Sequence, residues 1–69
     1  MLIEAFAVSS AMTRTYVKQV RVEDSNFQNA EALIDEAILK ETNGKATFKG
    51  ITSHTDQGLH FYTIVFERM

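Results

Sequence analysis

The chain has 69 residues, no cysteine and no proline, and a formal net charge of −2 at neutral pH. This length predicts a single domain over 1–69, and the lack of cysteine excludes disulfides and thiolate zinc sites. The mild charge argues against the strongly basic surface of a nucleic-acid-binding protein and against an extremely acidic surface that imitates DNA.

The first predicted element is a strand at 2–8, LIEAFAV. Its apolar run is short, is interrupted by Glu4 and has no basic residues before it, so it fits neither a signal peptide nor a membrane span. We therefore expect a cytoplasmic protein without membrane contact. The polar connection SSAMT at 9–13 leads to a second strand at 14–23, RTYVKQVRVE, rich in β-branched residues. A link this short predicts an antiparallel hairpin.

A helix is predicted over 24–44. Ser25 and Gln28 have the spacing of a capping box, which satisfies free amides at a helix start. Gly44 is expected to end the helix, because glycine takes the left-handed conformation at little cost. Apolar residues at helical spacing predict one buried stripe. The stripe consists of Phe27, Ala30, Ile34, Ala37 and Ile38, with Leu33 beside it.

Two further strands, at 45–53 and 59–67, flank the turn HTDQG, in which Gly58 suits a positive φ. The strands at 14–23 and 45–53 carry charges and suit sheet edges, whereas those at 2–8 and 59–67 are the most apolar. We predict an α+β fold of ββαββ order. Its four-stranded mixed sheet has order 2-1-4-3, with a parallel central pair and one helix packed on one face.

This order of elements resembles β-grasp domains, including ubiquitin-like proteins and the immunoglobulin-binding domains of streptococcal protein G. The chain ends Glu67-Arg68-Met69, without the di-glycine tail that ubiquitin-like proteins use for conjugation, so conjugation is not expected. The stretch VKQVRVEDSNFQNAEALIDEAI at 17–38 is similar to small phage-encoded inhibitors of host enzymes, such as some RNA polymerase inhibitors and anti-CRISPR proteins. That resemblance implies a phage or mobile-element protein that blocks a host protein or complex.

The turn of the second hairpin decides which residues lie under the helix. We predict a three-residue loop at 56–58, which pairs Thr55 with Leu59 and Phe48 with Phe66. A four-residue loop would reverse both faces, because side chains alternate along a strand. In the predicted register the helix covers Tyr62, Ile64 and Phe66, together with Tyr16, Val20 and Val22 of the second strand.

The opposite face carries the predicted binding surface. Because Glu4 should avoid the core, Phe6 and Val8 are expected on this outer face. One helix cannot cover both faces of a sheet, and an exposed apolar patch on the order of several hundred Å2 usually marks an interaction site. A moderately apolar face screened by polar neighbours is the alternative. The predicted partner-binding residues are Phe6, Val8, Ile51, Phe61 and Val65.

Little in the sequence suits catalysis or a cofactor. It contains no Gly-rich phosphate loop and no HExxH motif, and Ser9 and Ser10 are interpreted as loop residues. His54, Asp56 and His60 cluster at one turn and could share a metal ion. They fit solvated turn residues better, so neither metal nor cofactor is predicted.

The charged residues leave two alternatives. Arg14 and Lys18 on one side of the second strand, with Arg21 on the other, could contact phosphates, but a solvated edge fits this acidic chain better and nucleic acid is not expected. An acidic helix face could instead steer a basic partner. That face comprises Glu31, Asp35, Glu36 and Glu41.

The leading hypothesis is a non-enzymatic protein-interaction module that self-associates, as a homodimer or larger homo-oligomer. Phe6, Phe61 and Val65 would anchor a protein partner, as aromatic residues do at interface cores. The alternative is a homo-oligomer that binds a small ligand in an apolar pocket between copies. An enzyme ranks third, because no nucleophile and base are paired in the sequence.

Overall fold

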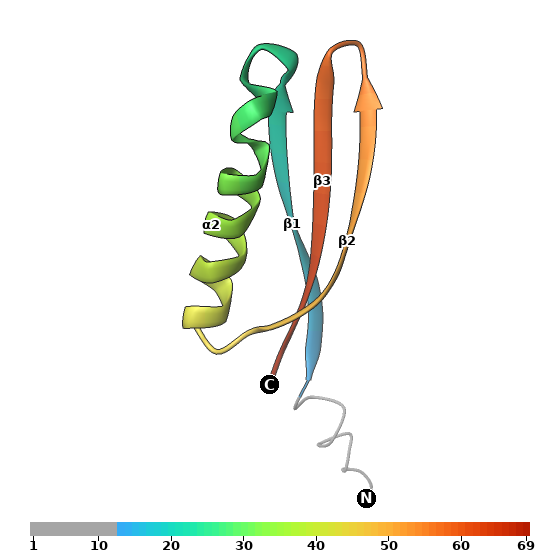
Figure 1. Cartoon of the computed structure of the whole chain (residues 1–69). Helices are drawn as coiled ribbons and strands as arrows, with labels where there is room; N and C mark the ends of the chain where they lie inside the picture. The colour runs from blue at the N-terminus through green and yellow to red at the C-terminus, as the bar shows by residue number, and fades with distance from the viewer. Residues whose placement is uncertain (1–12) are drawn as a thin grey trace, which may run out of the picture.

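The computed structural model describes residues 13–69, which form a small α+β fold with one sheet and one long helix (Figure 1). All three strands of the sheet are antiparallel to their neighbours, in the order β1-β3-β2. The predicted strand at 2–8 lies outside the described residues. The elements are β1 (Arg14–Glu23), the 3-10 helix η1 (Asp24–Asn29), α2 (Ala30–Asn43), β2 (Thr47–Asp56) and β3 (Leu59–Arg68).

The predicted four-stranded sheet of order 2-1-4-3 is wrong. The central strand β3 pairs antiparallel with β1 along one edge, from Arg14 opposite Arg68 to Glu23 opposite Leu59, and with β2 along its other edge. Because a strand has only two edges, β3 has no place for the parallel neighbour that the prediction gave it. Within residues 13–69, β1 and β2 are both edge strands, as their charges predicted, but each is the direct neighbour of β3.

The helix begins later than predicted, and the capping box at Ser25 is not formed. Residues 24–29 make a 3-10 helix without a side-chain cap, and Asn26 leaves helical geometry at φ −119° and ψ 16°. The backbone N–H of Asp24 donates to the carbonyl of Gly58 at 2.9 Å. This bond ties the segment to the β2–β3 turn, so Phe27 lies on the ring of His60, 4.5 Å between ring centres, rather than in the helical stripe.

Gly44 follows α2, but it does not adopt the left-handed conformation predicted for it. Its φ is −88°, and the positive φ of 79° belongs to Lys45. A Cβ at position 44 would lie 3.3 Å from Nη2 of Arg68. Glycine at this position therefore allows the end of α2 to approach the end of β3 closely.

The β2–β3 hairpin has a two-residue loop rather than the predicted three-residue loop. Asp56 pairs with Leu59, and Gln57 and Gly58 both have positive φ, of 48° and 79°, the backbone that a tight hairpin turn of matching twist requires. A bulge between Phe48 and Gly50 then shifts the register by one residue. The bulge cancels the one-residue error at the turn, so Phe48 lies opposite Phe66 as predicted.

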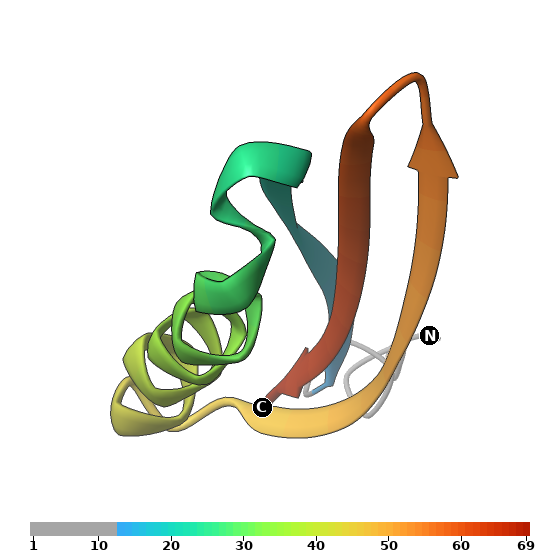
Figure 2. The same ribbon diagram turned by 45° about the horizontal axis from the view of Figure 1, so that its top comes forward.

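Figure 2 shows the effect of the bulge on the shape of β2. The Thr47 end of the strand curves toward the end of α2, and the Asp56 end stands clear of the helix. A bulge bends its strand and increases the local twist. The helix therefore covers only part of β2, and the central part of this strand is open to solvent.

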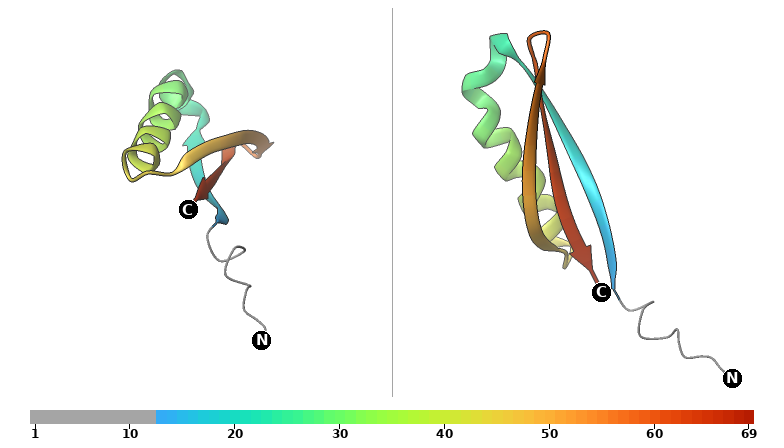
Figure 3. Two further views of the ribbon diagram at one scale, coloured as in Figure 1. Left: turned by 90° about the horizontal axis from the view of Figure 1, so that it is seen from below. Right: turned by 90° about the vertical axis from the view of Figure 1, so that its right-hand side faces the viewer.

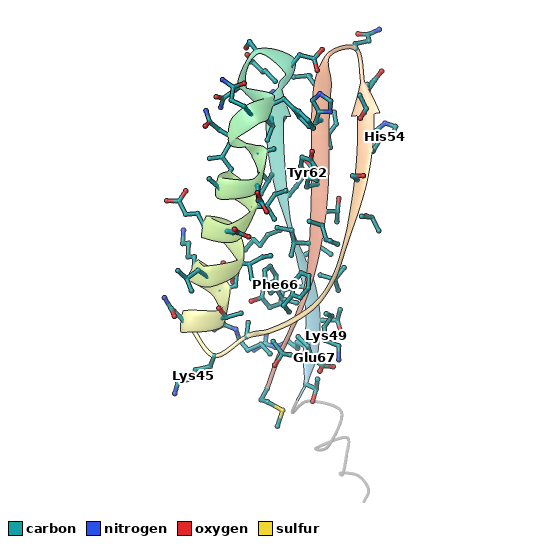
Figure 4. The ribbon with its side chains drawn as sticks, in the orientation of Figure 1. Lys45, Lys49, His54, Tyr62, Phe66 and Glu67 are labelled. Atoms are coloured by element: carbon teal, nitrogen blue, oxygen red, sulfur yellow. The ribbon has the colours of Figure 1, made fainter. Side chains whose placement is uncertain are left out.

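The core lies between α2 and the helix-facing side of β3. Ile64 and Phe66 have no exposed surface, and Phe66 packs against Tyr16 at 5.6 Å and against Phe48 at 6.4 Å between ring centres (Figure 4). This confirms that Ile64 and Phe66 lie under the helix. The helical stripe is confirmed for four residues: Ala30 is buried, and Ile34, Ala37 and Ile38 pack against the core cluster that contains Ile64 and Phe66.

One polar network fastens the end of α2 to both β1 and β3. Tyr16 Oη donates to Oε1 of Glu41 at 2.7 Å and accepts from Arg68 at 3.4 Å. Arg68 also lies 3.7 Å from Glu41. The hydrogen bond with Tyr16 raises the pKa of Arg68 above its ordinary value.

Removing the Tyr16 hydroxyl tests this network. Tyr16→Phe is expected to lower the free energy of unfolding by about 1–2 kcal/mol, because the partly buried Glu41 loses its closest donor. Urea denaturation followed by far-UV circular dichroism measures the change. Tyr62→Phe is the matched control, since the Tyr62 hydroxyl makes no hydrogen bond within residues 13–69, and it should change stability by no more than about 0.5 kcal/mol. Equal effects would contradict the role of the network.

Candidate protein-interaction surface

The sheet presents one face to α2 and leaves the other without a covering element among residues 13–69. The side view in Figure 3 shows the helix on one side of the three strands only. Even-numbered residues of β3 face the helix, as the burial of Ile64 and Phe66 shows. The odd-numbered residues, with their partners on β1 and β2, form the opposite side, here called the open face.

A column of side chains on β3, apolar from Leu59 to Val65 except for Thr63, runs along the middle of the open face. Leu59, Phe61 and Val65 lie along β3 on this face, each half-buried by its neighbours, and the polar Thr63 lies between Phe61 and Val65. Val17 lies directly opposite Val65 on β1 and is 55% exposed. On the other side of Val65 lies Gly50, and no atom lies within 4 Å of the place where its Cβ would be. The space beside Val65 on the β2 side is therefore open.

Polar side chains flank the rest of the column. Phe61 lies between Arg21 on β1 and His54 on β2, and the His54 ring stacks on it at 6.2 Å between centres. Near the end of the column, Lys49 lies 3.8 Å from Glu67 (Figure 4). The open face thus carries two apolar groups, Leu59 with Phe61 and Val65 with Val17, separated by the polar row of Gln19, Thr63 and Thr52 and bordered by charged side chains. Apolar residues bordered by polar ones are typical of protein interfaces.

The structure separates the predicted partner-binding residues. Phe61 and Val65 lie on the open face as expected from their parity. Ile51 lies opposite Ile64, on the helix-facing side near the sheet edge, and is 41% exposed. Its predicted placement beside Phe61 is wrong because Ile51 lies between the turn and the bulge, where the register differs by one residue from the prediction. Phe6 and Val8 lie outside the described residues.

Val17 is the surface residue that the sequence analysis missed. The sequence places Val17 on a charged edge strand, where a single exposed valine does not by itself indicate a binding surface. Its contact with Val65 depends on β1 being the direct neighbour of β3, and no local signal in the sequence specified that neighbour.

The histidines of the turn face opposite sides of the sheet. His54 stacks on Phe61 on the open face, whereas His60 lies on the helix side. The three-residue loop would have made them neighbours, and the two-residue loop moves them apart. Within residues 13–69, no three histidine or acidic side chains lie close enough together to hold a metal ion.

His60 instead joins a short polar chain that the sequence did not indicate. Its Nε2 contacts a carboxylate oxygen of Asp24, and its Nδ1 lies 3.3 Å from the hydroxyl of Thr55. Hydroxyl, imidazole and carboxylate in this order occur in acyl-transfer sites, which also need aligned donors for the oxyanion. Asp24 is mostly exposed, and the chain connects η1 to the turn, so we assign it a structural role.

The basic residues of β1 divide between the two faces, as the sequence predicted. Arg14 and Lys18 line a cleft of about 340 Å3 that also contains Glu41 and Arg68, whereas Arg21 lies opposite Phe61 on the open face. Glu41 lines the same cleft and lies 3.7 Å from Arg68. The three basic residues of β1 therefore do not lie on one face of the sheet.

The comparisons with known proteins leave the family open. No family model, no curated protein and no solved structure matches this chain. No helix within residues 13–69 has the length and apolar content needed to cross a membrane.

Proposed function

We propose that this protein is a non-enzymatic interaction module that binds a protein partner through its open face and also associates with itself. The observation that carries the proposal is the presence of three apolar residues, Phe61, Val65 and Val17, on a face that no element of residues 13–69 covers. Aromatic and aliphatic residues at the centre of a polar rim are the usual anchors of a binding site.

The mechanism we propose is steric occlusion of the partner. A three-stranded sheet held by a helix presents Phe61 and Val65 from regular backbone, so little conformational entropy is lost when a partner docks. The likeness of residues 17–38 to small phage-encoded inhibitors makes a host enzyme or complex the most concrete partner. In that role the chain would act by covering a functional surface, without chemistry of its own.

Phe61→Asp tests the proposed binding face. A charge at the centre of the column should reduce partner capture from host lysate by about tenfold or more, since burying an unpaired carboxylate at an interface is costly. Far-UV circular dichroism should be unchanged, because Phe61 points away from the core. Capture is measured by quantitative mass spectrometry of proteins retained on the immobilised full chain.

Leu39→Asp is the matched control. Leu39 is a 58% exposed apolar residue on α2, remote from the open face, so the same substitution there should leave capture intact. Equal loss with both variants would assign the binding to non-specific apolar contact. Unfolding of the Phe61→Asp variant would show that the open face is part of the core, and either result would reject the proposal.

A further inference from the structure

The outer edge of β2 is unpaired within residues 13–69 (Figure 1). Every residue of β2 is exposed except Gly50, which is half-buried. Backbone groups in an antiparallel ladder point alternately to the two sides of a strand. Because Asp56 and Leu59 close the two-residue turn as a hydrogen-bonded pair, Ile51, Ser53 and Thr55 direct their N–H and C=O groups away from β3. A row of unpaired backbone N–H and C=O groups along a strand edge is a template for pairing with another strand.

The side chains of β2 do not protect this edge. Between Lys49 and Asp56 the strand reads GITSHT, without a permanently charged residue or a proline. Short β-branched segments of low charge pair readily with other strands. The edge strand β1 differs, because three basic residues are spread along it: Arg14, Lys18 and Arg21. Like charges spread in this way oppose self-pairing, so β2 is the edge suited to it.

We propose that β2 pairs antiparallel with β2 of a second copy of this chain, about a two-fold axis at Ser53. Ser53 then faces Ser53 of the partner subunit, and Ile51 faces Thr55 of the partner subunit. Asp56 faces Gly50 of the partner subunit and lies beside the partner subunit's Lys49, so opposite charges meet at both ends of the interface.

The two-fold axis stands perpendicular to the sheet, which keeps α2 of both copies on the same side. Two three-stranded sheets become one continuous antiparallel sheet, and the open faces of both copies form one surface. This inference rests on the self-association in the proposed function and specifies the surface and the register that produce it.

A charge-swap experiment at Ser53 tests the axis. Sedimentation velocity of the full chain over a concentration series should show a dimer for the wild type. Ser53→Lys places two like charges opposite each other at the axis and should raise the dissociation constant about tenfold or more. Ser53→Glu should do the same. An equimolar mixture of the two variants should restore the dimer, because lysine then faces glutamate.

Gln19→Lys is the control, since it adds the same charge to an exposed position of β1 and should leave the dimer unchanged. A monomeric wild type would overturn the inference, including the case in which other residues of the same chain cover β2. A dimer that is unaffected by Ser53→Lys would also overturn the inference. The same holds if the equimolar mixture of Ser53→Lys and Ser53→Glu does not dimerise.

The two proposals fail in different ways. Phe61→Asp should lose partner capture and keep the dimer, whereas Ser53→Lys should lose the dimer and keep capture. A monomeric wild type whose capture still depends on Phe61 would reject edge pairing and support the open face. A dimer governed by Ser53 with no dependence of capture on Phe61 would reject the open face and support edge pairing.

Discussion

Replacing Phe66 by alanine is expected to lower the free energy of unfolding by about 3–5 kcal/mol. The ring is fully buried and joins β1, β2 and α2 through its contacts with Tyr16 and Phe48 and its place in the core cluster. A domain of this size has a stability of only about 5–8 kcal/mol, so the variant should be largely unfolded in modest urea. Urea denaturation followed by circular dichroism measures the loss.

Phe48→Ala is the matched control for this prediction. Phe48 lies directly opposite Phe66 on β2 but is 41% exposed, so its truncation leaves a smaller cavity and should cost roughly 1–2 kcal/mol. If the two variants were equally destabilised, the core would not be centred on β3.

A charge at Val22 should have the second large effect. Val22 is 1% exposed and faces the helix side of the sheet, opposite His60. Val22→Asp buries a carboxylate beside His60, whose imidazole is already engaged by Asp24, so the new charge costs about 3–5 kcal/mol. We expect a chain that is mostly unfolded at neutral pH, measured by the loss of far-UV circular dichroism and of a cooperative thermal transition.

Val17→Asp makes the same substitution on the same strand but on the open face. Val17 is 55% exposed, so its aspartate stays in water and the fold should survive with a change of no more than about 1 kcal/mol. Comparable unfolding of both variants would mean that the open face is covered in the folded chain, contrary to the proposed binding surface.

The two proposed surfaces lie apart from the core and from each other. The open face is centred on Phe61 and Val65 of the middle strand, and the self-association edge is centred on Ser53 of β2. Substitutions at Phe61 and Ser53 leave Ile64 and Phe66 untouched. Binding, self-association and stability can therefore be measured separately in one set of variants.

Periodicity in the sequence determined the elements and much of the burial in this protein. Alternation along 59–67 separates Phe61 and Val65 from Ile64 and Phe66, whatever the neighbouring strands are. Helical spacing likewise placed Ala30, Ile34, Ala37 and Ile38 on one buried stripe. These properties follow from the local geometry of strands and helices, so the order of residues is enough to predict them.

Tertiary structure alone decided which strands are neighbours and how they are aligned. The pairing of β1 with β3 joins residues far apart in the chain, and no local preference specifies it. The bulge beside Gly50 and the contact of Asp24 with His60 also depend on how β2 and η1 fit against β3. Ile51 shows the consequence most clearly, because a one-residue shift between turn and bulge moves its side chain to the other face of the sheet.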